Sequence, residues 1–116
     1  MEVVLFINME VRRGILFIRL CGFLNKKTSE ILKAKITSLI NLGIKYYVLN
    51  LEKLNSIDEE GCKTLKDNYE QIIKANGNLV LCGISQSMIE RFDCNETLFN
   101  IFKVNYESNA FRLLKL

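Results

Sequence analysis

Three consecutive carboxylates, Asp58-Glu59-Glu60, lie between a hydrophobic segment and Gly61, where the spacing of apolar residues indicates the start of a helix. Helix N-termini carry a partial positive charge and unpaired backbone N–H groups, so a change of side-chain charge there can alter the docking of a partner. A regulatory phosphate could occupy such a turn, but here carboxylates already fill it. The turn is therefore the first candidate for a protein-binding site.

The same carboxylates are poor candidates for catalysis. Consecutive residues at a helix start point in different directions, so Asp58, Glu59 and Glu60 do not converge as a general acid and base. The chain contains no histidine, no Gly-rich phosphate loop and no G-x-S-x-G motif. We therefore expect no enzymatic activity, no metal site and no cofactor.

A purely structural explanation of the turn is also open. Aspartate is a favoured N-cap, and glutamate in the first turn is stabilised by the helix dipole by roughly 0.3–1 kcal/mol. Gly61 then needs its own reason, because glycine in a helix costs about 1 kcal/mol relative to alanine. Close approach of another backbone, or of a partner, would supply that reason.

Composition excludes several classes of partner. The 116 residues, sixteen of them basic and thirteen acidic, predict one domain with a net charge of +3. The basic pairs Arg12-Arg13 and Lys26-Lys27 form no continuous stripe, so we expect no nucleic-acid binding. The apolar run at residues 3–7 is too short for a signal peptide or a membrane span, which leaves a first strand and no direct membrane insertion.

The four cysteines show no C-x-x-C pair, which together with the lack of histidine removes the usual zinc ligand sets. Three of them lie among apolar residues and are predicted to be buried free thiols: Cys21, Cys62 and Cys82. The fourth is Cys94. Free thiols fit a reducing compartment, so we expect a cytoplasmic protein.

Along the chain, apolar runs alternate with segments whose apolar residues have helical spacing. Strands are predicted after the N-terminal one at residues 14–21, 44–51, 78–84 and 101–104. The first two strands should form a hairpin across Arg12-Arg13-Gly14. Helices are predicted from Thr28 or Ser29 as cap to Gly43, from the acidic turn to Asn76-Gly77, from about Ser85 through Phe92, and around residues 110–114. This order predicts an α/β fold with a parallel or mixed sheet.

Several segments, in order, are similar to a known family. They are residues 18–25 with Thr28, residues 47–54, residues 57–61 and residues 76–85. With these segments the chain resembles the STAS domain from about Ile7 to its C-terminus. Within that family it resembles the anti-sigma factor antagonists of Gram-positive spore formers.

The resemblance implies a single STAS domain over residues 1–116, with a mixed four- to five-stranded β-sheet and about four α-helices packed mainly on one side. It also implies partner switching in sporulation-type transcription control. The antagonist binds an anti-sigma factor that is a serine kinase-like ATPase, which frees a sigma factor; the kinase phosphorylates a serine at the start of the second helix, and a phosphatase resets it. The implied partner-binding residues are Asn25, Thr28, Ser56, Asp58, Glu59, Glu60, Gly61 and Cys62.

At the decisive position the sequence departs from the family. The family pattern is Asp-Ser-Ser/Thr-Gly, and here Glu59 occupies the phosphate-accepting position. Glutamate has no hydroxyl, and its single charge only partly imitates a phosphate of about −1.5 to −2. The protein is then locked in a phospho-like state, or bound permanently to an adapted partner, or used as a scaffold. Asn25 also replaces a common acidic residue, and Ser56 is either a substitute phosphosite or an ordinary turn serine.

Three other possibilities stay open at this point. The chain could be a scaffold subunit of a transport or stress-signalling complex, as other STAS domains are. Nucleotide binding ranks last because there is no phosphate loop. The apolar N-terminal residues Val3 to Ile7 could form an edge strand that pairs with another copy, giving a homodimer.

Overall fold

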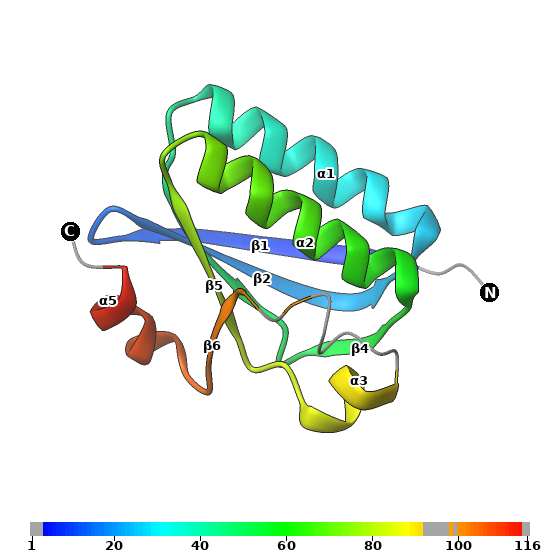
Figure 1. The fold of residues 1–116 in the computed structure, drawn as a ribbon. Coiled ribbons are helices and arrows are strands. Elements are labelled where there is room, and N and C mark those ends of the chain that lie inside the picture. Colours follow the sequence, from blue (N-terminus) through cyan, green and yellow to red (C-terminus); the bar gives the residue numbers. More distant parts are fainter. Residues whose placement is uncertain (1–3, 92–97, 99, 115–116) are drawn as a thin grey trace.

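A computed structural model describes residues 4–91, 98 and 100–114 of the chain. A mixed six-stranded sheet carries two long parallel helices on one face and a short C-terminal helix on the other (Figure 1). In chain order the elements are β1 (Leu5–Arg12), β2 (Ile15–Leu24), α1 (Lys26–Asn41), β3 (Tyr46–Asn50), β4 (Leu54–Ile57), α2 (Glu59–Lys74), β5 (Asn78–Cys82), α3 (Gln86–Arg91), β6 (Phe102–Val104), the 3₁₀ turn η1 (Glu107–Asn109) and α5 (Ala110–Leu113).

The sheet order is β1-β2-β3-β5-β6, with β4 pairing with the second half of β2. Among the described strands, β1 alone is antiparallel to its neighbour. The predicted hairpin between β1 and β2 is confirmed, and both of its turn residues have positive φ, 53° at Arg13 and 78° at Gly14. Two such residues give a turn whose twist matches that of the strands it joins.

Strand β2 separates two hydrophobic clusters. Leu16, Ile18 and Leu20 point into the main core beneath α1 and α2, while Ile15 and Phe17 point into a smaller cluster beneath α5. The near-continuous apolar run of this strand is explained by burial on both faces.

The predicted strand number was too low, because β4 was not recognised. This strand has four residues, and two of them, Asn55 and Ser56, are polar. It forms because β2, with ten residues, extends beyond β3. Strand β3 pairs with β2 only as far as Arg19. The second half of β2 therefore pairs with β4, after a register shift between Gly22 and Phe23.

The helix predictions hold with corrections. The first helix begins at Lys26 and is capped by Asn25, not by Thr28 or Ser29. Ser85 caps the third helix as predicted, because its Oγ accepts the Met88 N–H at 3.1 Å. The predicted end of that helix at Phe92 lies outside the described residues.

The prediction of buried free thiols is confirmed for Cys82 and wrong for Cys21 and Cys62. Cys82 is buried and free, and burial raises the pKa of its thiol to about 11. Cys21 is free but exposed. Cys62 is buried but disulfide-bonded, so the free-thiol prediction is wrong there, and Cys94 lies outside the described residues. Within those residues, no helix is long and apolar enough to cross a membrane.

Candidate functional site

Two helices begin side by side at one edge of the sheet. Strands β2 and β4 are parallel neighbours, with Leu24 opposite Ile57. One residue then leads from each strand into a helix, Asn25 into α1 and Asp58 into α2. Both N-termini, each with the partial positive charge of a helix start, therefore meet at the same place (Figure 1). We call the predicted residues gathered here the helix-start surface: Asn25, Thr28, Ser56, Asp58, Glu59, Glu60, Gly61 and Cys62.

The start of α1 is closed by a capping box. Asn25 Oδ1 accepts the N–H groups of Lys27 and Thr28, each at 3.0 Å. In return the Asn25 N–H donates to Thr28 Oγ1 at 3.0 Å, and that hydroxyl donates to the Phe23 carbonyl at 2.6 Å. Thr28 is only 2% exposed, so its role is to fix the turn rather than to offer a contact.

The start of α2 depends on Asp58. Its Oδ1 accepts the Gly61 N–H at 2.8 Å, which is the N-cap bond. Its Oδ2 accepts the Lys26 N–H at 3.3 Å, and its own N–H donates to the Leu24 carbonyl at 3.1 Å. One residue thus caps its own helix and joins it to the start of α1.

Gly61 is required by close packing. A Cβ at this position would lie 2.4 Å from the Leu24 carbonyl oxygen and 2.7 Å from Ile57 Cγ1. The first turn of α2 therefore rests directly on the end of β2. Of the two explanations foreseen for this glycine, the close approach of another backbone is confirmed.

Accessibility divides the predicted residues into two groups. Glu59 and Glu60 are exposed, while Asn25, Ser56 and Asp58 are half-buried. Gly61, Cys62 and Thr28 are buried, so they act on a partner only through the position of the turn. The part of this surface that a partner can reach is therefore dominated by two carboxylates.

Positive charges lie beside the carboxylates of this surface. Lys26 and Lys27 are exposed at the start of α1, beside Glu59 and Glu60 at the start of α2. Among the described residues, no ion pair involves these four side chains. Their charges thus remain available to a partner, although the α2 dipole stabilises the two carboxylates where they stand.

A second polar group, missed by the sequence analysis, lies on the opposite face of the sheet. Arg19 donates to both carboxylate oxygens of Glu107, from Nε at 2.8 Å and from Nη2 at 2.9 Å. It also donates to Asn8 Oδ1 at 2.9 Å and to Glu10 Oε1 at 2.8 Å. Glu107 further accepts from Arg12 at 3.0 Å and from Asn50 at 2.8 Å. We call these residues the Arg19 cluster: Asn8, Glu10, Arg12, Arg19, Asn50 and Glu107.

The Arg19 cluster ties η1 to β1, β2 and β3. The hydrogen bonds from Arg19 hold the pKa of Glu107 below its usual value, although burial acts in the opposite direction. The carboxylate in turn raises the pKa of Arg19. A lone arginine within the apolar run of residues 15–21 was the available signal, but its partner is 88 residues away.

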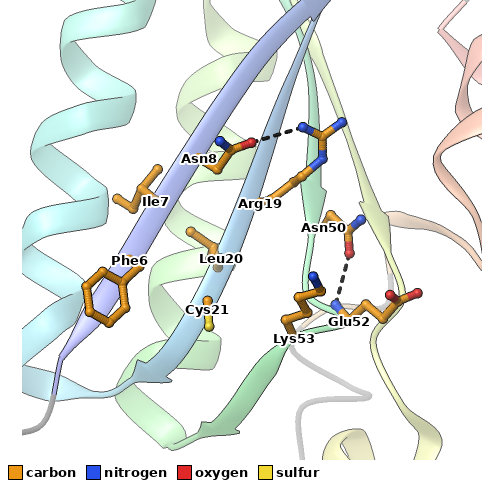
Figure 2. A pocket seen from close by; sticks show the side chains of 9 residues that line it. All are labelled: Phe6, Ile7, Asn8, Arg19, Leu20, Cys21, Asn50, Glu52 and Lys53. Carbon is orange, nitrogen blue, oxygen red and sulfur yellow. Dashed lines mark hydrogen bonds between the residues drawn. The ribbon is translucent and has the colours of Figure 1, made fainter.

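A hollow of about 390 Å³ opens beside the Arg19 cluster, between β1, β2 and the segment after β3 (Figure 2). Two hydrogen bonds join polar groups of its lining: Arg19 donates to Asn8 Oδ1, and the Glu52 N–H donates to Asn50 Oδ1 at 2.9 Å (Figure 2). Phe6 and Cys21 lie exposed along it. No group of three or more His, Cys, Asp or Glu side chains in the described part of the chain could hold a metal ion.

The sequence pattern of one family, described as the STAS domain, matches residues 6–108. The chain belongs to the STAS domain family. The match spans most of the chain, from β1 to η1. The predicted fold class is confirmed, with the corrected strand number.

Named relatives extend the comparison. The chain is 27% identical over 111 residues to the anti-sigma F factor antagonist of Paenibacillus polymyxa, covering 95% of this chain and 93% of the relative. It is 29% identical over 98 residues to the putative anti-sigma factor antagonist BtrV of Bordetella bronchiseptica, covering 84% of each chain. The solved structure of the anti-sigma factor antagonist SpoIIAA in its unphosphorylated form superimposes with a TM-score of 0.75 at 23% identity, covering 96% of this chain and 100% of SpoIIAA. At this identity the structural likeness supports the fold alone.

Proposed function

We propose that this STAS domain is a protein-binding regulator of the anti-sigma factor antagonist type, acting in the cytoplasm. Its partner is an anti-sigma factor of the serine kinase-like ATPase class, and it docks through the helix-start surface. Relatives named for this activity over nearly the whole chain support the proposal. The protein acts by binding, and no enzymatic step is assigned to it.

The observation that carries the proposal is the construction of the α2 start. The turn is fixed by the Asp58 cap and by contact of Gly61 with Leu24, while Glu59 projects from it into solvent. A change of charge at position 59 therefore alters what a partner meets without moving the backbone. Such an arrangement suits a surface whose partner is selected by charge.

Glu59 then determines how the regulator behaves. It stands where the family pattern has the phosphate-accepting serine, and a glutamate cannot take a phosphate. Its fixed single charge reproduces part of the charge that a phosphate would add. We infer that binding is independent of phosphorylation and is weaker than binding by a serine-bearing version. Ser56 is no substitute on this proposal, because it is half-buried in β4 opposite Phe23.

The experiment compares three tagged baits in a pull-down from the native host, read by mass spectrometry: wild type, Glu59→Ser and Glu59→Gln. We expect Glu59→Ser to recover the anti-sigma factor about tenfold better than wild type, equal to about 1.4 kcal/mol of binding free energy. It should also acquire a phosphate at position 59. Glu59→Gln keeps the side-chain shape but loses the charge, so it should bind well and stay unmodified.

The other outcomes are equally specific. Equal recovery by wild type and both variants would mean that the partner accepts Glu59, and the inferred phospho-like charge would be wrong while the antagonist role stood. Failure of all three baits to recover any anti-sigma factor would refute the proposed function. A stable complex with a membrane ATPase instead would favour a transport-complex subunit.

A further inference from the structure

We propose that two copies of this chain pair through the free edge of β1, forming an antiparallel β1–β1 contact with its two-fold axis at Met9. Strand β1 is eight residues long and, among the described strands, pairs only with β2. In the described part of the chain no strand pairs with its other side, so the backbone groups there are open to a second strand. This inference is independent of the proposed function.

The direction of the backbone groups selects which residues take part. The Phe23 N–H donates to the Val4 carbonyl at 3.0 Å, so the backbone groups of Val4 face β2. Because these groups alternate along a strand, Phe6, Asn8, Glu10 and Arg12 also face β2. The residues whose N–H and C=O groups face the open edge are therefore Leu5, Ile7, Met9 and Val11.

An antiparallel pairing centred on Met9 pairs the largest number of these edge-facing residues. Met9 then lies opposite Met9 of the second copy, and Ile7 lies opposite Val11 in both directions. Each of these three pairs exchanges two hydrogen bonds, which gives about six across the contact. A centre at Ile7 or Val11 would leave one end of the strand without a counterpart.

In this register, apolar side chains meet apolar side chains on the sheet face that carries α1 and α2. Ile7, Met9 and Val11 lie on that face, because they pair with Leu20, Ile18 and Leu16 of the main core. The contact would join these apolar side chains only to one another. Val11 is 64% exposed and Met9 41% exposed in the single chain, so both lose apolar surface to water on pairing.

Side chains also match on the opposite face of the sheet. Asn8 would lie opposite Glu10 of the second copy, and Phe6 opposite Arg12. The Asn8 amide nitrogen can donate to the Glu10 carboxylate, and Arg12 already packs against an aromatic ring in its own chain, 4.4 Å from the centre of Phe17. Phe6, which is 64% exposed, would gain the same kind of contact.

Helix α1 provides a separate observation at the same edge. Thr37 accepts a hydrogen bond from Gln71 of α2 at 3.1 Å, which marks the side of α1 that faces α2. At about 100° per residue, Ile31 and Leu42 lie on the flank turned away from α2, and hence toward β1. They are 51% and 77% exposed, which is unusual for large apolar residues on a solvent-facing flank.

The pairing would leave both helix-start surfaces open. Leu5 lies opposite Gly22, near the helix-start end of β2, whereas Arg12 lies at the hairpin end. In an antiparallel contact each helix-start end lies beside the hairpin end of the other copy. The dimer would therefore present two docking surfaces at opposite ends of one continuous sheet.

The first test measures molar mass by light scattering or sedimentation at protein concentrations up to about 1 mM. High concentrations are needed because a contact made through one pair of edge strands is small and therefore weak. We expect wild type to approach twice the monomer mass and Met9→Pro to remain monomeric. Proline at position 9 removes only an edge-facing N–H, so the fold should survive, as circular dichroism can check. Met9→Lys is a second disrupting variant. Phe102→Lys, at an exposed position of β6, is the matched control that should still dimerise.

A cross-linking test fixes the register. On a Cys21→Ala background, Met9→Cys should form a disulfide-linked dimer, because facing residues in a hydrogen-bonded pair lie about 5.5 Å apart between Cα atoms. Phe6→Cys should not, since its two copies would lie about 20 Å apart along the strands. A monomeric wild type at the highest concentration, a dimer unaffected by both Met9 variants, or equal cross-linking through positions 6 and 9 would each overturn the proposal.

Discussion

The helix-start surface and the Arg19 cluster use carboxylates in opposite ways. Glu107 is enclosed by donors from Arg19, Arg12 and Asn50, and its side chain is only 17% exposed. Glu59 and Glu60 stand in solvent. The enclosed carboxylate joins distant parts of the chain, whereas the exposed ones remain free to meet a partner.

Asp58 shows that both uses can occur within one turn. Its carboxylate points back to the N–H groups of Gly61 and Lys26, while the next residue, Glu59, points outward. A site built in this way keeps its shape when the outward residue changes. The comparison therefore predicts that substitutions of inward groups lower stability, and that substitutions of outward groups alter recognition alone.

The largest effect is expected from Gly61→Ala. The added methyl would meet the Leu24 carbonyl oxygen at 2.4 Å, so α2 must shift, at a cost of about 3 kcal/mol in unfolding free energy. Urea denaturation of both proteins measures this. The control is Gly43→Ala, where nothing lies within 4 Å and only the φ of +89° opposes a side chain, costing about 1 kcal/mol. Equal losses in the two variants would show that α2 does not rest on β2 as described.

The next effect is expected from Glu107→Gln, which removes the carboxylate charge facing Arg12 and Arg19 and should lower the unfolding free energy by about 2 kcal/mol at neutral pH. The pKa of Glu107 is lowered in the folded state. Its contribution is therefore fully present above the ordinary carboxylate pKa and is lost as the pH falls through the folded value. Lowering the pH should therefore reduce the unfolding free energy of wild type more than that of the variant.

Glu70→Gln on the exposed side of α2 is the matched control for this substitution. It should change neither the neutral-pH stability nor the acid profile. If Glu107→Gln behaves in the same way as this control, the Arg19 cluster contributes no net stability, and the contrast with the helix-start surface disappears.

The helix-start surface could largely be predicted from local sequence, and the Arg19 cluster could not. Capping residues act within one turn, so the role of Asp58 is visible in a few residues, whereas the close packing at Gly61 comes from Leu24 on another strand. Arg19 and Glu107 are brought together only when the sheet and η1 have formed, so no local sequence pattern predicts this pair.

Three local predictions failed for physical reasons. The N-cap of α1 is Asn25 rather than Thr28 or Ser29. Thr28 lies three residues later and is the reciprocal member of the capping box. Strand β4 is too short and too polar for a period-two pattern, and it depends on the excess length of β2. Cys21 is exposed because it lies on the sheet face away from α1 and α2, beyond the cluster beneath α5.

The smallest stability effect separates the two uses of charge within the turn itself. Asp58→Ala removes the N-cap acceptor and should lower the unfolding free energy by about 1 kcal/mol. Glu59→Ala, one residue later, removes only a solvated charge and should change it by less than about 0.5 kcal/mol. Parallel urea titrations compare the two, with partner recovery measured on the same samples. The comparison holds if Asp58→Ala loses stability and Glu59→Ala changes recovery alone, and it breaks if Glu59→Ala unfolds as readily as Asp58→Ala, because Glu59 would then support the turn rather than face a partner.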